Sequence, residues 1–263
     1  MTKKWYAIAD NEKADTAEIS IYDEIGFWGT TFVQFAEDFN KIKNRSSIKL
    51  YLNSVGGSVF DGLGIYNLLS SVHDRLTVEV MGLAASISSV IFLAGDIRIM
   101  DEGTFLMVHL PSVSTSGGSD DLRKDADTLD KIKEEIVNIY VNRTGMAQDT
   151  ITKLMEAETW FTADEAVKNG FATVTNKQAQ ATNCLYNLTS RGFVNVPKNL
   201  SRPAVTIADM TVRDFEKTLR DVGFSKSEAT LLASKFGAEK IDERESQGSL
   251  SAEAYEQLSK IFE

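Results

Sequence analysis

Apolar residues alternate with polar ones, or form short unbroken runs, in four segments of this chain, as is typical of β-strands. The segments are ISIY at 19–22, IKLYL at 48–52, LTVEVM at 76–81 and TFLMVHL at 104–110. Helical spacing of apolar residues is found between them, over 31–43, over 62–70 and after Ser86. Strands that alternate with helices predict an α/β fold with a mostly parallel sheet, and functional sites in such folds form at the carboxyl ends of the strands.

A long helix is predicted over 119–143, because apolar residues recur there at spacings of three and four. They form one stripe, made of Leu122, Ala126, Leu129, Ile132, Ile136 and Ile139. Ser119 is the expected N-cap and Gly145 the expected stop. At 1.5 Å per residue such a helix is about 36 Å long. It either lies across its own domain or projects and buries its stripe against another subunit.

A shorter helix is predicted in FTADEAVKNGF, residues 161–171. Thr162 and Glu165 have the spacing of a capping box, in which each side chain bonds the backbone of the other, and Gly170 is suited to end the helix. The strand and helix patterns stop soon after this point, so we predict one domain over residues 1–175.

The sequence after residue 175 has a different character. Residues 176–205 are polar, lack a helical period and hold Pro197 and Pro203, so we predict a linker. Residues 206–263 are predicted to form a small helical module, with helices that begin at Thr211 and Ser225. Two helices joined by a tight turn also occur in DNA-binding proteins, but an acidic chain is a poor match for a phosphate backbone. We therefore expect an assembly or docking module.

Composition narrows the class of protein. The chain has 263 residues, with 28 Lys and Arg against 38 Asp and Glu and a formal net charge of −10, which argues against nucleic acid as a partner. Cys184 is the single cysteine, so an intrachain disulfide and a thiolate metal cluster are excluded. The apolar run without charge at 80–95 is too short and too rich in glycine and serine to span a membrane, and we see no secretion signal. We expect a cytoplasmic protein with no metal, no cofactor and no membrane partner.

The segment 78–95, VEVMGLAASISSVIFLAG, contains the candidate nucleophile. A strand leads into a turn, and Ser86 then opens an apolar helix, so its hydroxyl lies beside helix amides that have no partner within the helix. A serine also needs a base to take its proton, and histidine is the usual base. Of the two histidines, His73 lies among charged residues, whereas His109 ends an apolar strand. Ser86 and His109 are therefore the predicted nucleophile and base.

Two backbone amides are candidates for an oxyanion hole, which acyl transfer requires. The Ile87 amide directly follows the candidate nucleophile. The other comes from Gly56 and Gly57, which follow the strand 48–52, and glycine lets a backbone approach a ligand closely.

Four motifs together resemble one family in their order and spacing. They are NSVGGSVFDGLGIYNLL, MGLAASISSVIFLAG, FLMVHLPS and WFTADEAVKNGFA, and the resemblance to the Clp protease proteolytic subunit family covers roughly residues 18–175. It implies the Clp/crotonase-like fold of stacked ββα units with a long handle helix. It also implies Ser86 as nucleophile, His109 as general base and the amides of Gly57 and Ile87 as the oxyanion hole.

The resemblance also implies a third member of a catalytic triad, an acidic residue. The family has an aspartate a few residues before its FTADEA-like block, and Glu158 occupies that place in EAETWFTADEA. Glu156 and the absence of a third member are the alternatives. The charged residues by which the family couples two rings are absent, and the amino-terminal segment is unlike the family's axial loops.

ETWFTADEA and TVRDFEKTLRDVGFSKSEA look more like the phage branch of the family, the head maturation proteases. That resemblance implies an ATP-independent serine endopeptidase that cuts capsid or scaffold proteins in a bacterial host cytoplasm or procapsid. We expect the substrate strand to bind by β-strand addition between the loop with Gly56, Gly57 and Ser58 and the segment with Gly117 and Gly118. We further expect a homo-oligomeric ring, and contacts of the C-terminal module with capsid or scaffold proteins.

Two rival hypotheses remain at this stage. An acyl-CoA enzyme of the crotonase superfamily would share the paired oxyanion amides but not the serine–histidine pair. A catalytically degenerate protease would serve as an assembly or scaffold protein. Fluorophosphonate labelling of Ser86 separates both from a serine endopeptidase.

Overall fold

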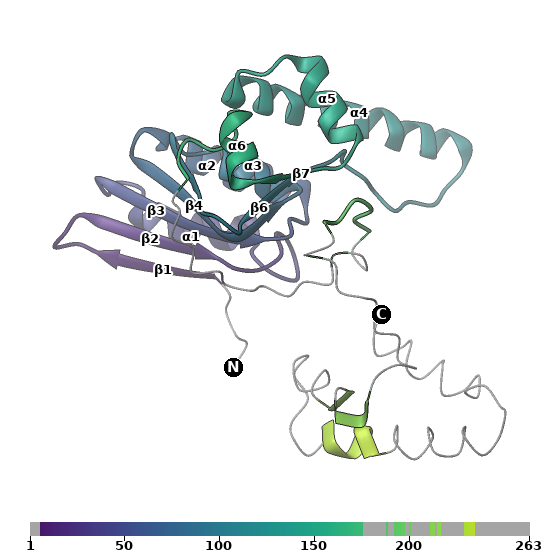
Figure 1. The fold of residues 1–263 in the computed structure, drawn as a ribbon, viewed down its shortest axis with the longest axis horizontal. Coiled ribbons are helices and arrows are strands. Elements are labelled where there is room, and N and C mark those ends of the chain that lie inside the picture. The colour runs from purple at the N-terminus through teal and green to yellow at the C-terminus, as the bar shows by residue number, and fades with distance from the viewer. Residues whose placement is uncertain are drawn as a thin grey trace. The chain divides into compact units, whose positions relative to one another are not determined.

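The strands pair into a sheet whose middle is parallel (Figure 1). The computed structural model describes residues 6–175, 188, 192–197, 200, 211–213, 215–216 and 229–234. The strands in these residues are β1 (Tyr6–Asn11), β2 (Thr16–Ile21), β3 (Ser47–Ser54), β4 (Leu76–Ala85), β5 (Ile97–Met100), β6 (Phe105–Val108) and β7 (Thr159–Thr162). They lie in the order β1-β2-β3-β4-β6-β7, with β5 beside β4. Antiparallel pairs occur only at the two ends of this order, β1 with β2 and β6 with β7, so the predicted α/β fold is confirmed.

Helices connect the strands and cover the sheet. Those described are α1 (Phe32–Ile42), α2 (Val59–Ser70), α3 (Ile87–Phe92), α4 (Ser119–Thr144), α5 (Gln148–Glu156) and α6 (Ala163–Lys168). Figure 1 shows α4, α5 and α6 together above the sheet. Every second residue of β3, namely Ile48, Leu50 and Leu52, is buried in a core shared with the helices, as the alternation of a half-covered strand requires.

Several local signals of the sequence are present in the structure. Thr162 and Glu165 form the expected capping box at the start of α6. Gly145, with φ 76°, ends α4 in the left-handed conformation. The N-cap of α4 is Gly118 and not Ser119, which is instead the first helical residue. Strands β1, β5 and β7 and helix α5 were not predicted.

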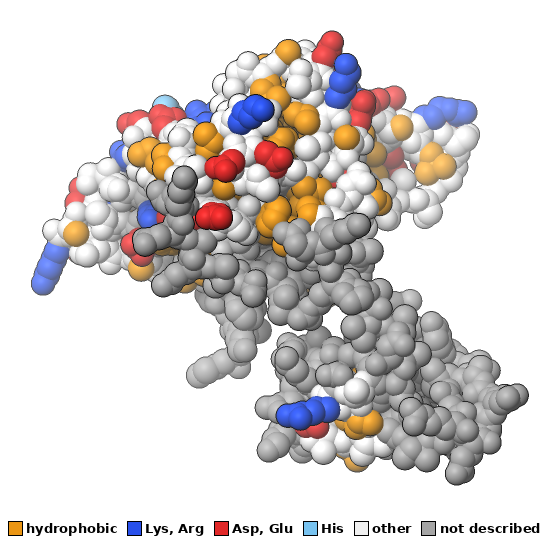
Figure 2. All heavy atoms as spheres, viewed as in Figure 1, with side chains coloured by type: hydrophobic (Ala, Val, Ile, Leu, Met, Phe, Trp, Pro, Cys, Tyr) orange, Lys and Arg blue, Asp and Glu red, His pale blue; other side chains and the backbone are white. Residues whose placement is uncertain are grey.

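The amino-terminal half of α4 projects from the domain. The buried residues of the helix, Ile136, Val137 and Tyr140, all lie in its carboxyl-terminal half. Leu122, at the other end of the apolar stripe, is 44% exposed. Figure 1 shows this end of α4 running out past the sheet, and Figure 2 shows apolar side chains on it among charged ones. The helix thus combines the two arrangements considered for it: its carboxyl-terminal half packs on its own domain and its amino-terminal half projects, and burial of the stripe against another subunit stays a prediction.

The chain divides into two compact units, 1–201 and 202–263. In the second unit residues 212–213, 215–216 and 229–234 are helical, and Ser225, the expected start of a helix, lies outside the described residues. Part of the predicted linker, 176–205, is packed on the domain rather than exposed. Leu188 and Phe193 are buried in a small apolar cluster with Leu83 and Met107 of the sheet, so this part of the segment packs on the first unit. No described helix has the length and apolar composition to cross a membrane.

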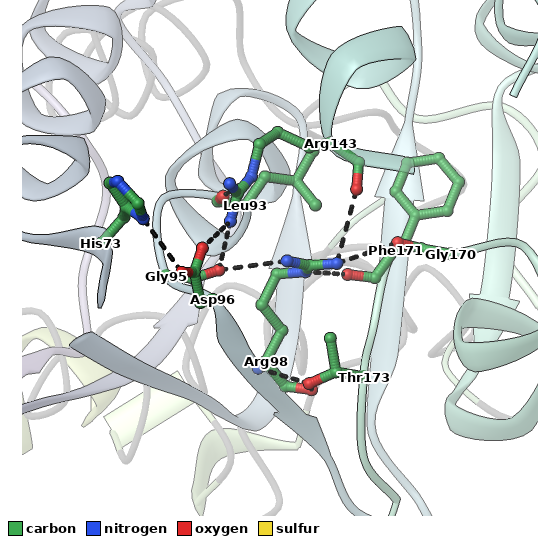
Figure 3. A network of polar contacts seen from close by, with 9 residues as sticks. All are labelled: His73, Leu93, Gly95, Asp96, Arg98, Arg143, Gly170, Phe171 and Thr173. Atoms are coloured by element: carbon green, nitrogen blue, oxygen red, sulfur yellow. Dashed lines mark hydrogen bonds and ion pairs between the residues drawn. The ribbon is translucent and has the colours of Figure 1, made fainter. Parts of the chain in front are cut away.

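Arg98 is a buried cation that bonds the carboxyl-terminal ends of three helices (Figure 3). Its guanidinium donates to the carbonyls of Phe171 at 2.6 Å, Gly170 at 3.1 Å, Gly95 at 3.1 Å and Arg143 at 3.5 Å. These carbonyls follow or belong to the last turns of α6, α3 and α4, where a positive charge is favourable. Burial and the charge of Arg143 lower the pKa of Arg98 to about 10, so the group is still charged at neutral pH.

Arg143 adds a second set of bonds at the same place. It donates to the Leu93 carbonyl at 2.8 Å and the Gly95 carbonyl at 2.6 Å, and it pairs with Asp96 at 3.1 Å. Asp96 also bonds His73, the histidine expected at the surface, which is half-exposed. Together the two arginines fix the end of the short helix α3, whose start carries the candidate nucleophile (Figure 3).

Replacing Arg98 with Met should lower the free energy of unfolding by about 3 kcal/mol, because several buried carbonyls lose their donor. Urea unfolding followed by circular dichroism measures the change. Arg123→Met is the matched control, since the Arg123 side chain is 72% exposed, and it should leave the stability unchanged. Equal stability of Arg98→Met and the wild type would show that these bonds do not stabilise the helix ends.

Candidate active site

Ser86 lies in the tight turn between β4 and α3. Its backbone has φ 56° and ψ −132°, a left-handed conformation that costs a residue with a side chain about 1–3 kcal/mol. The turn is fixed by the Ser86 amide, which donates to the Met107 carbonyl at 3.0 Å. The Ser88 hydroxyl lies 2.7 Å from the Ala85 carbonyl and 2.9 Å from that of Ser54. The hydroxyl of Ser86 is thereby presented at the carboxyl end of the sheet.

His109 meets Ser86 as the sequence predicts. It directly follows β6, and its Nε2 lies 2.8 Å from Ser86 Oγ. In the neutral ring that can act as a base, Nε2 accepts the hydrogen bond from the hydroxyl and Nδ1 carries the proton. Burial lowers the pKa of His109, and the negative charge of Glu158 opposes this only in part. The ring is therefore kept neutral and ready to accept a proton.

The loop of Gly56 and Gly57 approaches the turn closely. A Cβ on Gly56 would lie 2.7 Å from Ser86 Cβ and 3.1 Å from the Ile87 amide nitrogen. The Gly56 amide donates to Ser54 Oγ at 3.1 Å. Within the described residues the amides of Gly57 and Ile87 have no acceptor, so they are free to donate to a ligand, and their role as an oxyanion hole stays a prediction.

An open cavity of about 300 Å³ surrounds these groups. Its lining combines Ser86 and His109 with residues of four loops and the start of α2, namely Glu24, Val55, Gly56, Gly57, Val59, Pro111, Ser112 and Phe193. Ser58 is not part of this lining and instead caps α2, accepting from the Asp61 amide at 3.4 Å. Gly117 and Gly118 also lie outside the lining and are exposed before α4. A role for these three residues in substrate binding stays a prediction.

A smaller apolar pocket, about 20 Å³, adjoins Ser86 and His109. It is lined by Val59, Ile87, Val90, Pro111, Ile136 and Tyr140. Ile136 and Tyr140 belong to α4, and the Tyr140 hydroxyl lies 2.7 Å from Ser89 Oγ in α3. The long helix thus contributes to the site itself.

Glu158 is buried near the base but is bonded to other groups. It is 7% exposed and has φ 46°, in the turn between α5 and β7. Its Oε1 accepts from the amides of Val194 at 2.8 Å and Asn195 at 2.7 Å and from the indole of Trp160 at 3.3 Å. In the described part of the chain no hydrogen bond joins its carboxylate to His109, and Glu156, the alternative, is exposed. Glu158 reaches His109 through its charge.

Phe193 was missed by the sequence analysis. It is 6% exposed, and its ring lies 5.7 Å from that of His109 and 5.9 Å from that of Trp160. Nothing in RGFVNVP marks the residue as functional, because the surrounding segment is polar and without period. Among the described residues no group of three or more His, Cys, Asp or Glu is placed to hold a metal ion.

Comparison with known proteins identifies the family of this chain. The family model named Clp protease matches residues 33–178, more than half of the chain. The chain belongs to the Clp protease family. Ser86, His109, Glu158 and the glycine loop all fall within the matched residues, whereas Phe193 follows them.

Individual relatives of the Clp protease family show the same extent of similarity. The chain is 35% identical over 128 residues to the ATP-dependent Clp protease proteolytic subunit 3 of Streptomyces coelicolor, covering 48% of this chain and 59% of the relative. It is 36% identical over 124 residues to the protein of the same name from Rhodococcus jostii, covering 46% and 61%. The matched part of the chain thus spans about three fifths of the length of these curated relatives.

The buried environment of His109 has a consequence for pH dependence. Because the neutral ring is the reactive form and its pKa is lowered by burial, the reaction of Ser86 with a fluorophosphonate should stay fast to a lower pH than an exposed histidine allows. The acid limb of the rate profile should fall below about 6.5, the ordinary histidine value. His73→Gln is the control and should not move the limb. An acid limb at or above the ordinary value would contradict this assignment of the base.

Proposed function

We propose that this chain is a serine endopeptidase. The observation that carries the proposal is the 2.8 Å contact between Ser86 Oγ and His109 Nε2 beside two unoccupied backbone amides. A serine–histidine pair at this distance, with donors for an oxyanion, is the arrangement that acyl transfer to serine requires. An acyl-CoA enzyme of the crotonase superfamily needs the amides but has no use for the pair.

The reaction follows from the positions of these groups. Ser86 Oγ attacks the carbonyl carbon of the peptide bond while His109 Nε2 takes the hydroxyl proton. The carbonyl oxygen becomes an oxyanion and is stabilised by the Gly57 and Ile87 amides. His109 then protonates the leaving amine, and an acyl-enzyme forms on Ser86. Water, deprotonated by His109, then attacks the acyl carbon, the bond to Ser86 Oγ breaks, and His109 returns the proton to that oxygen. The charge of Glu158 stabilises the imidazolium in both steps.

The substrate we propose is an extended polypeptide. Residues 109–118 leave β6 without strand or helix structure and can pair with a peptide by β-strand addition. Gly56 and Gly57 line the same cavity as Pro111 and Ser112 of this segment. The small apolar pocket beside Ser86 would favour an apolar side chain next to the bond that is cut.

Phage capsid or scaffold proteins are the substrate class we propose, in a bacterial host cytoplasm or procapsid. The support is the resemblance of ETWFTADEA and of the tail TVRDFEKTLRDVGFSKSEA to phage head maturation proteases. We also propose that cleavage needs no ATP, since the serine–histidine reaction consumes no nucleotide. The C-terminal unit would then bind other head components.

Replacing Ser86 with Ala should abolish both fluorophosphonate labelling and cleavage of an unstructured protein such as casein, assayed without ATP. Mass spectrometry of the labelled wild type should place the adduct on Ser86. Ser71→Ala is the matched control, because Ser71 is exposed at the end of α2 and is not among the residues that line the cavity, and it should keep both activities. Labelling that persists in Ser86→Ala would overturn the assignment. A chain that is never labelled and cuts nothing would favour the degenerate scaffold protein, and hydrolysis of a CoA thioester alone would favour the acyl-CoA enzyme.

We propose that the exposed half of α4 contacts other copies of the chain in a homo-oligomeric ring. Its apolar stripe has no cover within the described residues at Leu122, which is 44% exposed. A stripe of this kind is stable in water when another surface buries it.

Introducing a charge into the stripe should therefore disrupt the assembly. Leu129→Asp should shift the mass measured by analytical ultracentrifugation toward the monomer, because an unpaired carboxylate would be buried at the interface. Asn138→Asp adds the same residue to the opposite, exposed face of α4 and should leave the mass unchanged. A wild-type chain that is already monomeric at assay concentration would refute the ring.

A further inference from the structure

We propose that residues 192–197, here called the strap, form a wall of the active site and that Phe193 is a positioning residue for His109. The inference deepens the proposed function and rests on it. The strap follows the residues that match the Clp protease family, 33–178, and lies outside them.

The contacts of Phe193 place it against the catalytic base. Its ring packs on the imidazole of His109 at 5.7 Å between centroids and 57° between planes. It also lines the cavity that contains Ser86. With only 6% of its surface exposed, the ring excludes water from one side of His109 and limits how far the imidazole can turn.

Glu158 holds the strap in this position. Its carboxylate accepts from the amides of Val194 at 2.8 and 3.0 Å and Asn195 at 2.7 Å. The Asn195 side chain donates in return to the Ala157 carbonyl at 2.8 Å. Hydrogen bonds from amides to a carboxylate are stronger than those between neutral groups. Ala157 and Glu158 therefore fix the backbone segment that contains Phe193.

An apolar cluster packs against the strap. Phe193 and Leu188 are buried with Val55, Leu83, Ala85 and Met107, and Trp160, Val196 and Leu200 pack against them. Trp160 meets Phe193 edge to face at 5.9 Å and donates its indole proton to Glu158 at 3.3 Å. Trp160 thus contacts both Glu158, which bonds the strap, and the ring of Phe193.

These contacts make an aromatic ring, that of Phe193, the group that orients His109 from the side. In a serine–histidine–acid triad the carboxylate accepts from Nδ1 and fixes the ring. Within the described residues Nδ1 of His109 has no hydrogen-bond partner, and the carboxylate bonds the strap instead. Ser86 then orients the imidazole at Nε2 and Phe193 orients it from the side. Glu158 acts on the base in two ways, through the strap and through its charge.

Three variants of the full chain test this role. Phe193→Ala removes the ring, and Phe193→Leu keeps an apolar side chain without the aromatic face. Val194→Ala is the control, because the Val194 side chain is 79% exposed and its amide is unchanged.

Two readouts are needed. The pKa of His109 is measured by NMR titration, which is simple because the chain has two histidines and His73→Gln assigns the other. The second readout is the rate of fluorophosphonate labelling of Ser86.

We expect Phe193→Ala to raise the pKa of His109, because water reaches the ring, and to slow labelling by about tenfold or more through loss of orientation. Phe193→Leu should keep the pKa near the wild-type value and slow labelling by about threefold, and Val194→Ala should change neither. The charged groups that face His109, Glu158 and the cavity residue Glu24, are the same in all variants.

The outcomes separate this inference from the proposed function. If the wild type is labelled but Phe193→Ala has the same rate and pKa, the positioning role is refuted and the peptidase stands. Faster labelling of Phe193→Ala would also refute it, since the strap would then be an obstruction. If no variant is labelled while the pKa still rises, the proposed function fails and the packing role stands. Should Phe193→Ala not fold, equal labelling of Phe193→Leu and Val194→Ala would refute the role.

Discussion

The left-handed backbone of Ser86 is the constraint on which the rest of the site depends. A residue with a side chain adopts this conformation only where its neighbours stabilise it. The amide of Ser86 bonds the Met107 carbonyl, and this bond places the end of β6, and therefore His109, beside the turn. The same geometry brings the Ser86 Cβ so close to Gly56 that a side chain there would overlap it. Ser86, His109 and the glycine loop are thus positioned by one turn.

Helix α3 links this turn to the far side of the domain. The helix has six residues, all buried, and too few hydrogen bonds of its own to be stable alone. Arg143 bonds the carbonyl of Leu93 directly after it, and Tyr140 bonds Ser89 within it. Both residues belong to α4, which also lines the small pocket beside Ser86. The carboxyl-terminal half of α4 therefore packs on the short helix that begins directly after Ser86.

The sequence predicts the parts of the site that depend on local patterns. Ser86 and His109 each follow a strand with a clear apolar run. Gly56 and Gly57 likewise follow β3 after a short, fixed spacing. Strands β5 and β7 have four residues each, too few to show a period. Phe193 could not be found in this way, because its burial arises from packing against Leu83, Met107 and Trp160, which are distant in the chain. Glu158 as the third member of the triad stays a prediction, and its hydrogen-bond partners Val194 and Asn195 were not foreseen.

The glutamate in place of the family's aspartate is consistent with this set of partners. A carboxylate that is nine-tenths buried needs donors for its oxygens, and here two backbone amides and an indole provide them. Those amides, in turn, would lack an acceptor if the carboxylate bonded only His109. A hydrogen bond to Nδ1 depends strongly on direction, whereas the attraction between a carboxylate and an imidazolium depends mainly on distance. The longer side chain can therefore bond the strap and still stabilise the charge that His109 gains, which leaves orientation of the ring to Phe193.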